Sequence, residues 1–188
     1  MKNNNNIYLD VLDICNLDKI RKWRNNGIEK GIYRTPYLLT SDMQIDFFEN
    51  VINNRNINAR YWGIFKEEAE GERDKEIDTF IGYTGLDKIQ WENGNSEIAL
   101  TIGPKYISKG YGSKVLSLVL KEGFKNMRLQ NIYGECYKCN PNIGFWEKMI
   151  KKYNGYSTIL PSRKFFNGSF FNSLYFNFNH YYFEERNK

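Results

Sequence analysis

The sequence has little cysteine and histidine, and it has no long apolar run. Cys15, Cys136 and Cys139 are an odd number of thiols in a chain of 188 residues, so we expect reduced cysteines rather than a disulfide framework. The single histidine, His180, cannot complete a zinc site with Cys136 and Cys139, and no metal is expected. No window approaches the roughly 18 apolar residues of a membrane span, and the first residues lack the apolar core of a signal peptide. We therefore expect no membrane association and a cytoplasmic location.

The composition indicates one globular domain over residues 1–188, with its core at about residues 6–179. Hydrophobic residues make up 41% of the chain and aromatic residues 16%, which is enough for a substantial core. The net charge of +5 is mildly basic, and the lysines and arginines are scattered rather than grouped. This distribution argues against a nucleic-acid partner. It fits a site for a polyanionic small molecule, and it fits an ordinary solvated surface equally well.

Hydrophobic periodicity and turn residues predict a mixed sheet with helices on its faces. The expected strands cover residues 7–13, 60–66, 77–86, 95–103, 131–139, 155–166 and 170–178. The expected helices run from a cap at Asn16 through Trp23, from Ser41 to Ile52, from Gly112 to Met127 and from about Pro141 onward. Ser41 and Gln44 have the spacing of a capping box, residues 27–39 read as a loop, and the charged run 66–76 reads as a solvated hairpin tip. Asn167-Gly168 predicts a tight turn between the last two strands.

The most informative segment is Ile107-Ser108-Lys109-Gly110-Tyr111-Gly112-Ser113-Lys114, in which two glycines open a helix just after a strand. Glycine lets the backbone approach a ligand closely because it has no Cβ. The free N–H groups of the first helical turn, at the positive end of the helix dipole, then point at an anion. We therefore expect a phosphate or pyrophosphate at this turn.

Several segments, taken in this order and spacing, resemble the GNAT superfamily of acyl-CoA-dependent N-acyltransferases. The resemblance covers nearly the whole chain and is carried by residues 22–25, 80–86, 97–104, 109–113, 145–148 and 170–175. Within the superfamily, the chain is similar to the branch that holds ribosomal-protein N-terminal acetyltransferases and many small-amine and amino-sugar acetyltransferases. The resemblance implies an α/β (α+β) fold. Its central sheet is mixed, mostly antiparallel and seven-stranded, is splayed between strands 4 and 5, and is flanked by about four helices.

The resemblance also implies acetyl-CoA as co-substrate and assigns residues to it. The pyrophosphate would contact the glycine turn, at Ser108, Lys109, Gly110, Tyr111, Gly112 and Ser113. The pantetheine arm would lie along the splayed strand at Leu100, Thr101 and Ile102, with hydrogen bonds from Asn140 or Asn142. Ile107 stands where the family usually has arginine or glutamine, which removes one side-chain contact but leaves the backbone amides in place.

Direct acetylation of an amine requires a base, because an ammonium group has no lone pair. By resemblance Glu97 is the candidate general base, with Asp87 and Glu92 in reserve. Backbone N–H groups near Thr101 are expected to stabilise the oxyanion, and no covalent acyl-enzyme is expected. The family often places a tyrosine acid in the helix after the fifth strand, but Trp146 stands there and indole cannot serve. Water or Tyr137 is then the expected proton donor to the leaving thiolate.

The acceptor side is expected to be walled by Trp23, Arg24, Tyr33 and Arg34, together with Tyr37, Arg163, Phe165 and Phe166. Aromatic rings beside arginines suit a sugar, a nucleotide or a peptide carboxylate equally, and they also suit ordinary packing. The expected function is transfer of an acetyl group to a primary amine, with a protein or peptide N-terminus favoured. An amino sugar, a nucleotide sugar or another small amine is the alternative acceptor, and an inactive acyl-CoA-binding module is the alternative class. Either a monomer or a homodimer fits.

Overall fold

A computed structural model describes residues 6–53, 57–67 and 78–185, and it contains one seven-stranded sheet in the order β1-β2-β3-β4-β5-β7-β6. Neighbouring strands are antiparallel except for β4 and β5, which are parallel. The strands are β1 (Ile7–Asp10), β2 (Arg60–Lys66), β3 (Thr79–Gln90), β4 (Asn95–Ile102), β5 (Asn131–Tyr137), β6 (Tyr156–Phe166) and β7 (Ser169–Asn179). The mixed, mostly antiparallel sheet expected from the sequence is therefore confirmed.

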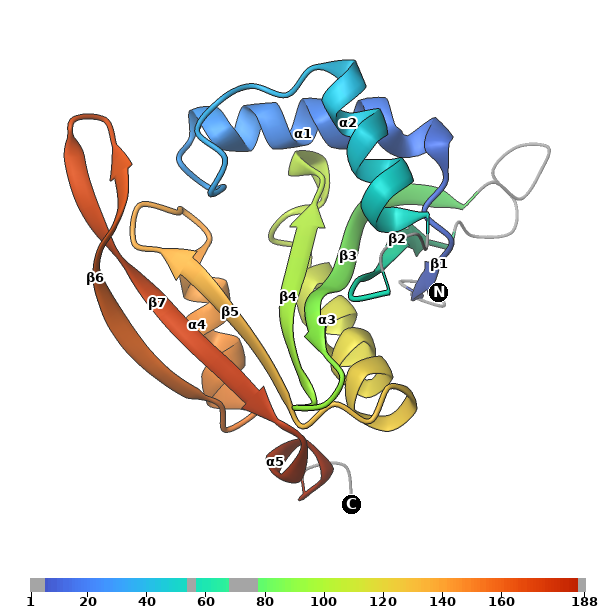
Figure 1. The fold of residues 1–188 in the computed structure, drawn as a ribbon, viewed down its shortest axis with the longest axis vertical. Coiled ribbons are helices and arrows are strands. Elements are labelled where there is room, and N and C mark those ends of the chain that lie inside the picture. Colours follow the sequence, from blue (N-terminus) through green and yellow to red (C-terminus); the bar gives the residue numbers. More distant parts are fainter. Residues whose placement is uncertain (1–5, 54–56, 68–77, 186–188) are drawn as a thin grey trace.

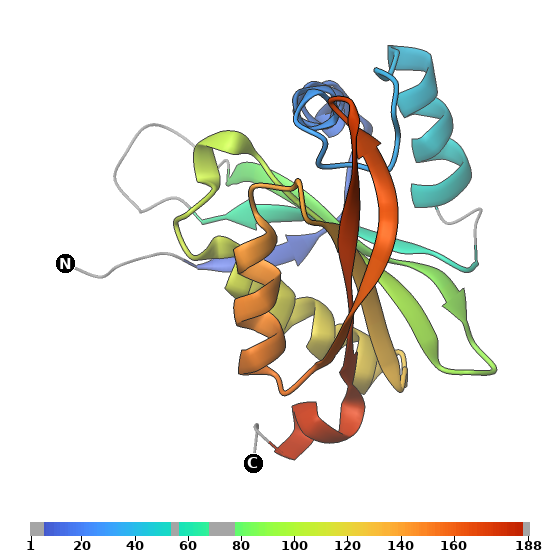
Figure 2. The same cartoon turned by 90° about the vertical axis from the view of Figure 1, so that its left-hand side faces the viewer.

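Helices cover both faces of this sheet (Figures 1 and 2). They are α1 (Leu17–Glu29) and α2 (Ser41–Phe47) on one face, α3 (Tyr111–Lys121) and α4 (Ile143–Lys152) on the other, and α5 (His180–Glu185) after β7. Short 3₁₀ turns occupy Ile14–Asn16 and Pro104–Tyr106, and π-helical turns at Phe48–Ile52 and Glu122–Asn126 extend α2 and α3. Within the described ranges, no helix has the length and apolar character that crossing a bilayer would need.

The larger part of the core lies between α3, α4 and the sheet. Val115, Leu116, Val119 and Leu120 repeat at helical spacing and are completely buried, so α3 presents one continuous apolar face to the sheet. A second, smaller cluster fills the space under α1 and α2. It consists of Leu12, Leu17, Ile20, Ile52, Phe80 and Tyr83. The strand β3 contributes to both cores, through Ile81 and Leu86 to the larger one and through Phe80 and Tyr83 to the smaller one.

The structure differs from the sequence-based expectations mainly at the ends of elements. β1 stops at Asp10 rather than at residue 13, because the Asp13 side chain accepts a hydrogen bond from the Ile14 N–H and starts a 3₁₀ turn. Asn16 does precede α1, but its side chain makes no capping hydrogen bond. The cap of α2 is Thr40 rather than Ser41, since the Thr40 hydroxyl accepts from the Met43 N–H at 3.2 Å.

Several further boundaries differ. α1 continues to Glu29, three residues into the expected loop, and β3 continues to Gln90. α4 begins at Ile143, after Pro141, and the short helix α5 was not expected. Most of the charged run 66–76, expected to be a hairpin tip, lies outside the described residues, as does the expected start of β3 at residue 77.

Candidate active site

The sheet opens between β4 and β5. The two strands pair only at their first residues, Asn95 with Asn131, Ser96 with Ile132 and Glu97 with Tyr133. Beyond Glu97, β4 pairs with β3 alone, while β5 pairs with β7 alone (Figure 1). Residues 98–102 of β4 therefore have no partner strand on the β5 side, and their backbone can pair with an extended ligand. The splay expected between strands 4 and 5 is confirmed.

A cavity of about 490 Å³ lies at this opening. It is walled by α1 and the loop after it, by β4, by the glycine turn before α3 and by the start of α4. The residues expected to contact the cofactor that line this cavity are Leu100, Thr101, Ile102, Ser108, Gly110, Gly112, Ser113, Asn140 and Asn142. The structure thus brings together segments that lie up to about forty residues apart in the chain, on the wall of one cavity.

Two of the expected cofactor contacts, Lys109 and Tyr111, are not part of this wall. The Tyr111 side chain is buried in the main core, with 6% of its surface exposed. The Lys109 ammonium lies 5.9 Å above the ring of Tyr106. Tyr111 is the first residue of α3 and lies on the same buried helix face as Val115, four residues later. The Tyr111 residue still supplies a backbone N–H at the first position of α3.

The glycine turn has the backbone geometry of an anion site. Gly110 caps α3 in the left-handed region, with φ of 82°, and a Cβ at this position would meet nothing within 4 Å. A Cβ on Gly112 would lie 3.1 Å from the Phe145 ring. Gly110 is therefore required for its backbone conformation. Gly112 is required for space, because the lack of a Cβ lets the start of α3 approach Phe145 of α4. The first N–H groups of a helix point out of its end, so the start of α3 suits an anion such as a diphosphate.

The start of α4 forms the opposite wall. Asn140 is buried, and its side-chain oxygen accepts from the Asn142 N–H at 2.9 Å, which fixes the turn that follows β5. Trp146 lines the cavity and stacks on Phe176, with ring centroids 4.6 Å apart. Trp146 therefore gives this wall an apolar surface, and it supplies no acid at the position where the family often has a tyrosine.

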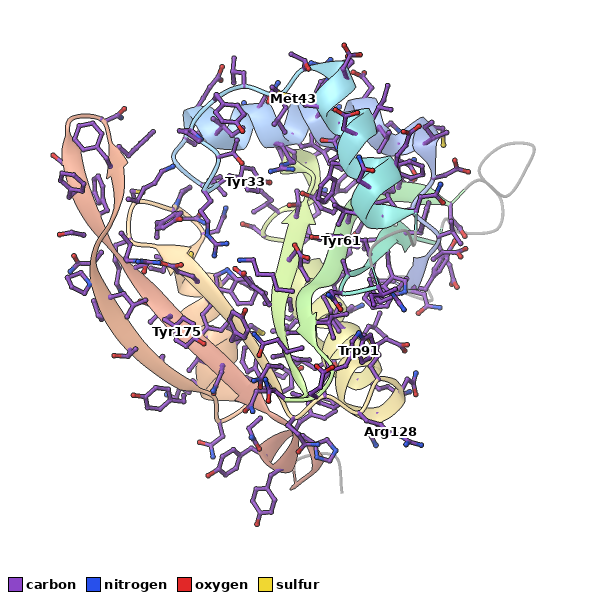
Figure 3. The ribbon with its side chains drawn as sticks, viewed as in Figure 1. Tyr33, Met43, Tyr61, Trp91, Arg128 and Tyr175 are labelled. Atoms are coloured by element: carbon purple, nitrogen blue, oxygen red, sulfur yellow. The ribbon has the colours of Figure 1, made fainter. Side chains whose placement is uncertain are left out.

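Three of the residues expected on the acceptor side lie at the cavity or beside it. Trp23 and Tyr33 line it, and the Arg24 guanidinium lies 5.4 Å above the Tyr33 ring. The Tyr33 hydroxyl is 3.1 Å from Oγ1 of Thr101, and burial raises the pKa of Tyr33, so the phenol stays protonated. Figure 3 shows Tyr33 in the loop after α1, above the space between β4 and β5. A hydroxyl donor is therefore placed beside the unpaired part of β4.

Glu97 lies where β4 and β5 separate, and it is held by two cations. The Arg34 guanidinium is 2.5 Å from Oε1, and the Lys88 ammonium is 2.6 Å from Oε2. Burial alone would raise the pKa of Glu97, but the hydrogen bonds from Arg34 and Lys88 outweigh it and hold the pKa below its usual value. The carboxylate is ionised at neutral pH, and each of its oxygens already has a cationic partner.

A second buried carboxylate, Glu135, lies on the neighbouring strand and shares Arg34 with Glu97. It accepts hydrogen bonds from the Ser173 hydroxyl at 2.6 Å and from Arg163 Nε at 3.1 Å, and the Arg34 guanidinium is 3.5 Å away. Burial would raise its pKa, but the hydrogen bonds from Ser173 and Arg163 outweigh that effect and lower it. Sequence reasoning did not single out Glu135 or Lys88. Alternation along β5 puts Glu135 on the same face as Tyr133 and Tyr137, which was the available signal.

The remaining expected groups lie around this charged cluster. Asp87 faces Glu97 across the β3–β4 pair and accepts a hydrogen bond from the Tyr61 hydroxyl at 3.1 Å. Glu92 lies in the exposed turn between these strands. Burial raises the pKa of Tyr137, whose hydroxyl interacts with Arg34, and Tyr137 is not on the cavity wall. Within the described ranges, no group of histidine, cysteine and acidic residues is arranged to hold a metal ion.

Known proteins share both the sequence pattern and the fold. The sequence profile of the acetyltransferase (GNAT) domain matches residues 10–144. A curated relative, an uncharacterized N-acetyltransferase p20 of Bacillus licheniformis, is 34% identical over 58 residues, which span 31% of this chain and 33% of the relative.

Solved structures of similar fold include spermidine N-acetyltransferase from Vibrio cholerae in complex with CoA and spermine. It has a TM-score of 0.76 and 18% identity, and the alignment covers 95% of this chain and 98% of that one. A chimera of the Vibrio cholerae enzyme with hSSAT has a TM-score of 0.73 and 17% identity, with 96% and 99% covered. The profile match extends over more than half of the sequence, and the chain belongs to the GNAT acetyltransferase family.

Proposed function

We propose that this protein transfers an acetyl group from acetyl-CoA directly to a primary amine. One observation carries the proposal: a single cavity at the opened sheet reaches from the glycine turn at Gly110 to the unpaired edge of β4. This shape suits a long ligand with an anionic end and an extended amide-bearing arm. The diphosphate of acetyl-CoA would bind the first amides of α3, and its pantetheine arm would pair with residues 100–102.

The reaction needs few groups once the two substrates meet at the splay. The amine nitrogen attacks the thioester carbon, the carbon–sulfur bond breaks, and the sulfur leaves with the bonding electron pair. The amine loses a proton, and the thiolate gains one. Backbone N–H groups of β4 near Thr101, together with the protonated Tyr33 hydroxyl beside it, are the donors placed to stabilise negative charge on the carbonyl oxygen.

We propose Glu97 as the group that accepts the proton of the amine, directly or through a water molecule. Its ionised carboxylate lies at the point where β4 and β5 part, which supports this role. Its two ion pairs lower its basicity, so an oxygen must first be released by Arg34 or Lys88.

The proton donor to the thiolate has two tyrosine candidates. The sequence favoured Tyr137, and that role stays a prediction. Tyr33 is better placed, because it lines the cavity, whereas the Tyr137 hydroxyl interacts with Arg34. The raised pKa of each phenol means that it donates a hydrogen bond to the thiolate but does not readily give up its proton. The proton that the thiolate gains then comes from water.

The acceptor is a primary amine, and a protein or peptide N-terminus remains the first acceptor to test. The structural likeness to spermidine acetyltransferases, at 17–18% identity, supports the fold alone. An amino sugar, free or nucleotide-linked, also fits the aromatic and arginine residues around Tyr33. A panel of these amines, assayed by thiol release from acetyl-CoA, tests the proposal. Acetylated product from at least one primary amine is expected.

A binding module without catalysis is the second candidate, and Trp146 at the usual acid position is the observation that favours it. Such a module would bind CoA tightly and release no thiol with any amine in the panel. Tight binding of CoA without turnover would therefore show that the protein is a binding module and not an enzyme. Mass spectrometry after incubation with acetyl-CoA should also find no acetyl group retained on Cys136 or Cys139, because the proposed transfer is direct.

A further inference from the structure

We propose that the amine acceptor of this protein also carries an anionic group, a phosphate or a carboxylate, and that Arg34 and Lys88 bind it. The inference rests on the proposed function, because it concerns the acceptor side of the same site. It starts from the order in which charges are layered around the point where β4 and β5 part.

The charged cluster consists of Glu97, Glu135, Arg34, Lys88 and Arg163. Its two carboxylates are buried, and its three cations are exposed to solvent. The side chains of Glu97 and Glu135 are 11% and 8% exposed. The side chains of Arg34, Lys88 and Arg163, which pair with them, are 52%, 56% and 53% exposed. A molecule that approaches from solvent therefore meets guanidinium and ammonium groups first, and it meets the carboxylates only after displacing them.

The cations also outnumber the carboxylates. Glu97 and Glu135 supply two negative charges, and Arg34, Lys88 and Arg163 supply three positive charges. Two more charged groups lie at the margins of the cluster and cancel each other. They are Asp87, opposite Glu97 on β3, and Lys164, which donates to the Tyr33 carbonyl at 2.8 Å. The cluster carries a net positive charge, which attracts an anion.

The backbone bends to bring Lys88 into this cluster. Asp87 and Glu97 are directly opposite each other on one face, so regular alternation would turn Lys88 to the other face. The pairing of β3 and β4 instead shifts register between Asp87 and Gln90, and Lys88 adopts φ of 50°. A bulge of this kind commonly re-aims a side chain near an active site. Here the bulge places the Lys88 ammonium against the Glu97 carboxylate. Lys88 thus occupies the position at which a cationic substrate could pair with Glu97.

This arrangement disfavours polyamines as acceptors. A second ammonium of a polyamine would have to compete with Arg34 and Lys88 for Glu97. A phosphate or carboxylate instead binds the exposed sides of these cations without first breaking an ion pair, and a guanidinium can contact such a group through two N–H donors. The shared chemistry is an amine with a nearby anion, whether the anion belongs to a sugar phosphate or to an acidic residue beside a peptide N-terminus.

Binding of the anion also prepares the base. An anion that draws Arg34 or Lys88 toward itself leaves an oxygen of Glu97 without its cation. That oxygen can then accept the proton of the attacking amine. The anion of the acceptor thus frees the Glu97 carboxylate from a cation that holds it in the unliganded protein. This links recognition of the anion to the chemical step.

Matched acceptor pairs test the inference. One pair is glucosamine 6-phosphate and glucosamine, and the other is the peptide amides Ala-Asp-Gly and Ala-Asn-Gly; spermidine is the cationic comparison. We expect the anionic member of at least one pair to have kcat/KM higher by about tenfold to a hundredfold, as for one charged hydrogen-bonded contact. The two pairs tell phosphate from carboxylate.

Substitution of the cations must remove this preference. In Arg34→Gln and Lys88→Gln the ratio within the pair should fall toward one, whereas Lys125→Gln, an equal charge change beyond α3, should leave it intact. The inference is overturned if uncharged or cationic acceptors are preferred, or if the preference survives both substitutions. Turnover of spermidine alone would leave the proposed function standing and sink only this inference.

A binding measurement decides the case in which none of these acceptors is acetylated. Protein saturated with CoA is titrated with inorganic phosphate and followed by NMR. Phosphate should shift the resonances of residues around Arg34 and Lys88, and the shifts should weaken severalfold in Arg34→Gln but not in Lys125→Gln. If phosphate causes no such shifts while CoA is bound, the anion site does not exist.

Discussion

The Arg34 guanidinium lies 2.5 Å from Oε1 of Glu97, although the two residues are 63 positions apart in the chain. Arg34 belongs to the loop after α1, and Glu97 is the last residue of β4 that pairs with β5. The contact therefore joins the loop after α1 to the point where the sheet opens. It also controls how basic the Glu97 carboxylate is.

The Arg34–Glu97 pair should make stability depend on acid pH. Because the pKa of Glu97 is lowered in the folded state, its contribution is present above the unfolded value near 4.3 and is lost as the pH falls through the folded value. Arg34→Gln should lower the free energy of unfolding by about 1–2 kcal/mol at neutral pH. Urea unfolding at several pH values measures it. A deficit that persisted undiminished near pH 3 would mean that Glu97 is not the titrating group.

Replacement of Glu97 should change the pH dependence of the reaction. Glu97→Gln should lower kcat/KM by about a hundredfold at neutral pH, and the loss should shrink as the pH rises, because the amine then deprotonates without help. Glu135→Gln is the matched control, since Glu135 also pairs with Arg34 but is one strand away. Its pH–rate profile should keep the shape of the parent protein. An unchanged profile in Glu97→Gln would remove Glu97 from the mechanism.

The two tyrosines at the opening should differ in their effect on kcat. Tyr33→Phe removes the hydroxyl that lines the cavity beside Thr101, so kcat should fall by about tenfold with little change in the KM for acetyl-CoA. Tyr137→Phe removes a partner of Arg34 and should have the smaller effect on kcat. The reverse order, measured in steady state with one amine, would assign the proton donor to Tyr137.

The left-handed cap of α3 should be intolerant of a side chain for conformational reasons alone. Gly110 has φ of 82° and Gly144 lies within α4, and a Cβ on either would meet nothing within 4 Å. Gly110→Ala should cost about 1–2 kcal/mol of unfolding free energy. Gly144→Ala should raise it by up to about 1 kcal/mol, because alanine favours a helix over glycine. Equal effects in denaturant titrations would mean that Gly110 does not hold this conformation in solution.

Local patterns predicted the order of the strands and of the helices before α5, and the resemblance to the GNAT superfamily added about half of the residues on the cavity wall. The glycine turn at Gly110 and Gly112 and the apolar spacing from Val115 to Leu120 each need only a few neighbouring residues to be recognised. Element ends were less predictable. Thr40 and Ser41 are both good helix caps, and the choice of Thr40 follows from the path of the preceding loop.

The contacts of the charged cluster could not be predicted from the sequence, although Glu97, Arg34 and Arg163 were each expected at the site. Lys88 joins it only because a register shift turns its side chain to the face of Glu97. Glu135 joins it because β5 pairs with β7, and β7 with β6, in registers that bring Ser173 of β7 and Arg163 of β6 to its carboxylate. These contacts depend on pairing between distant segments, and no local pattern specifies them.

Calorimetric titration with CoA and with pantetheine tests the central claim most directly, that the diphosphate of an acyl carrier binds the turn at residues 108–113. The account predicts one CoA bound per chain. Pantetheine, which lacks the diphosphate, should bind at least about tenfold more weakly, because charge-assisted hydrogen bonds to the first amides of α3 are lost. No detectable association with CoA, or equal affinity for the two compounds, would contradict the account.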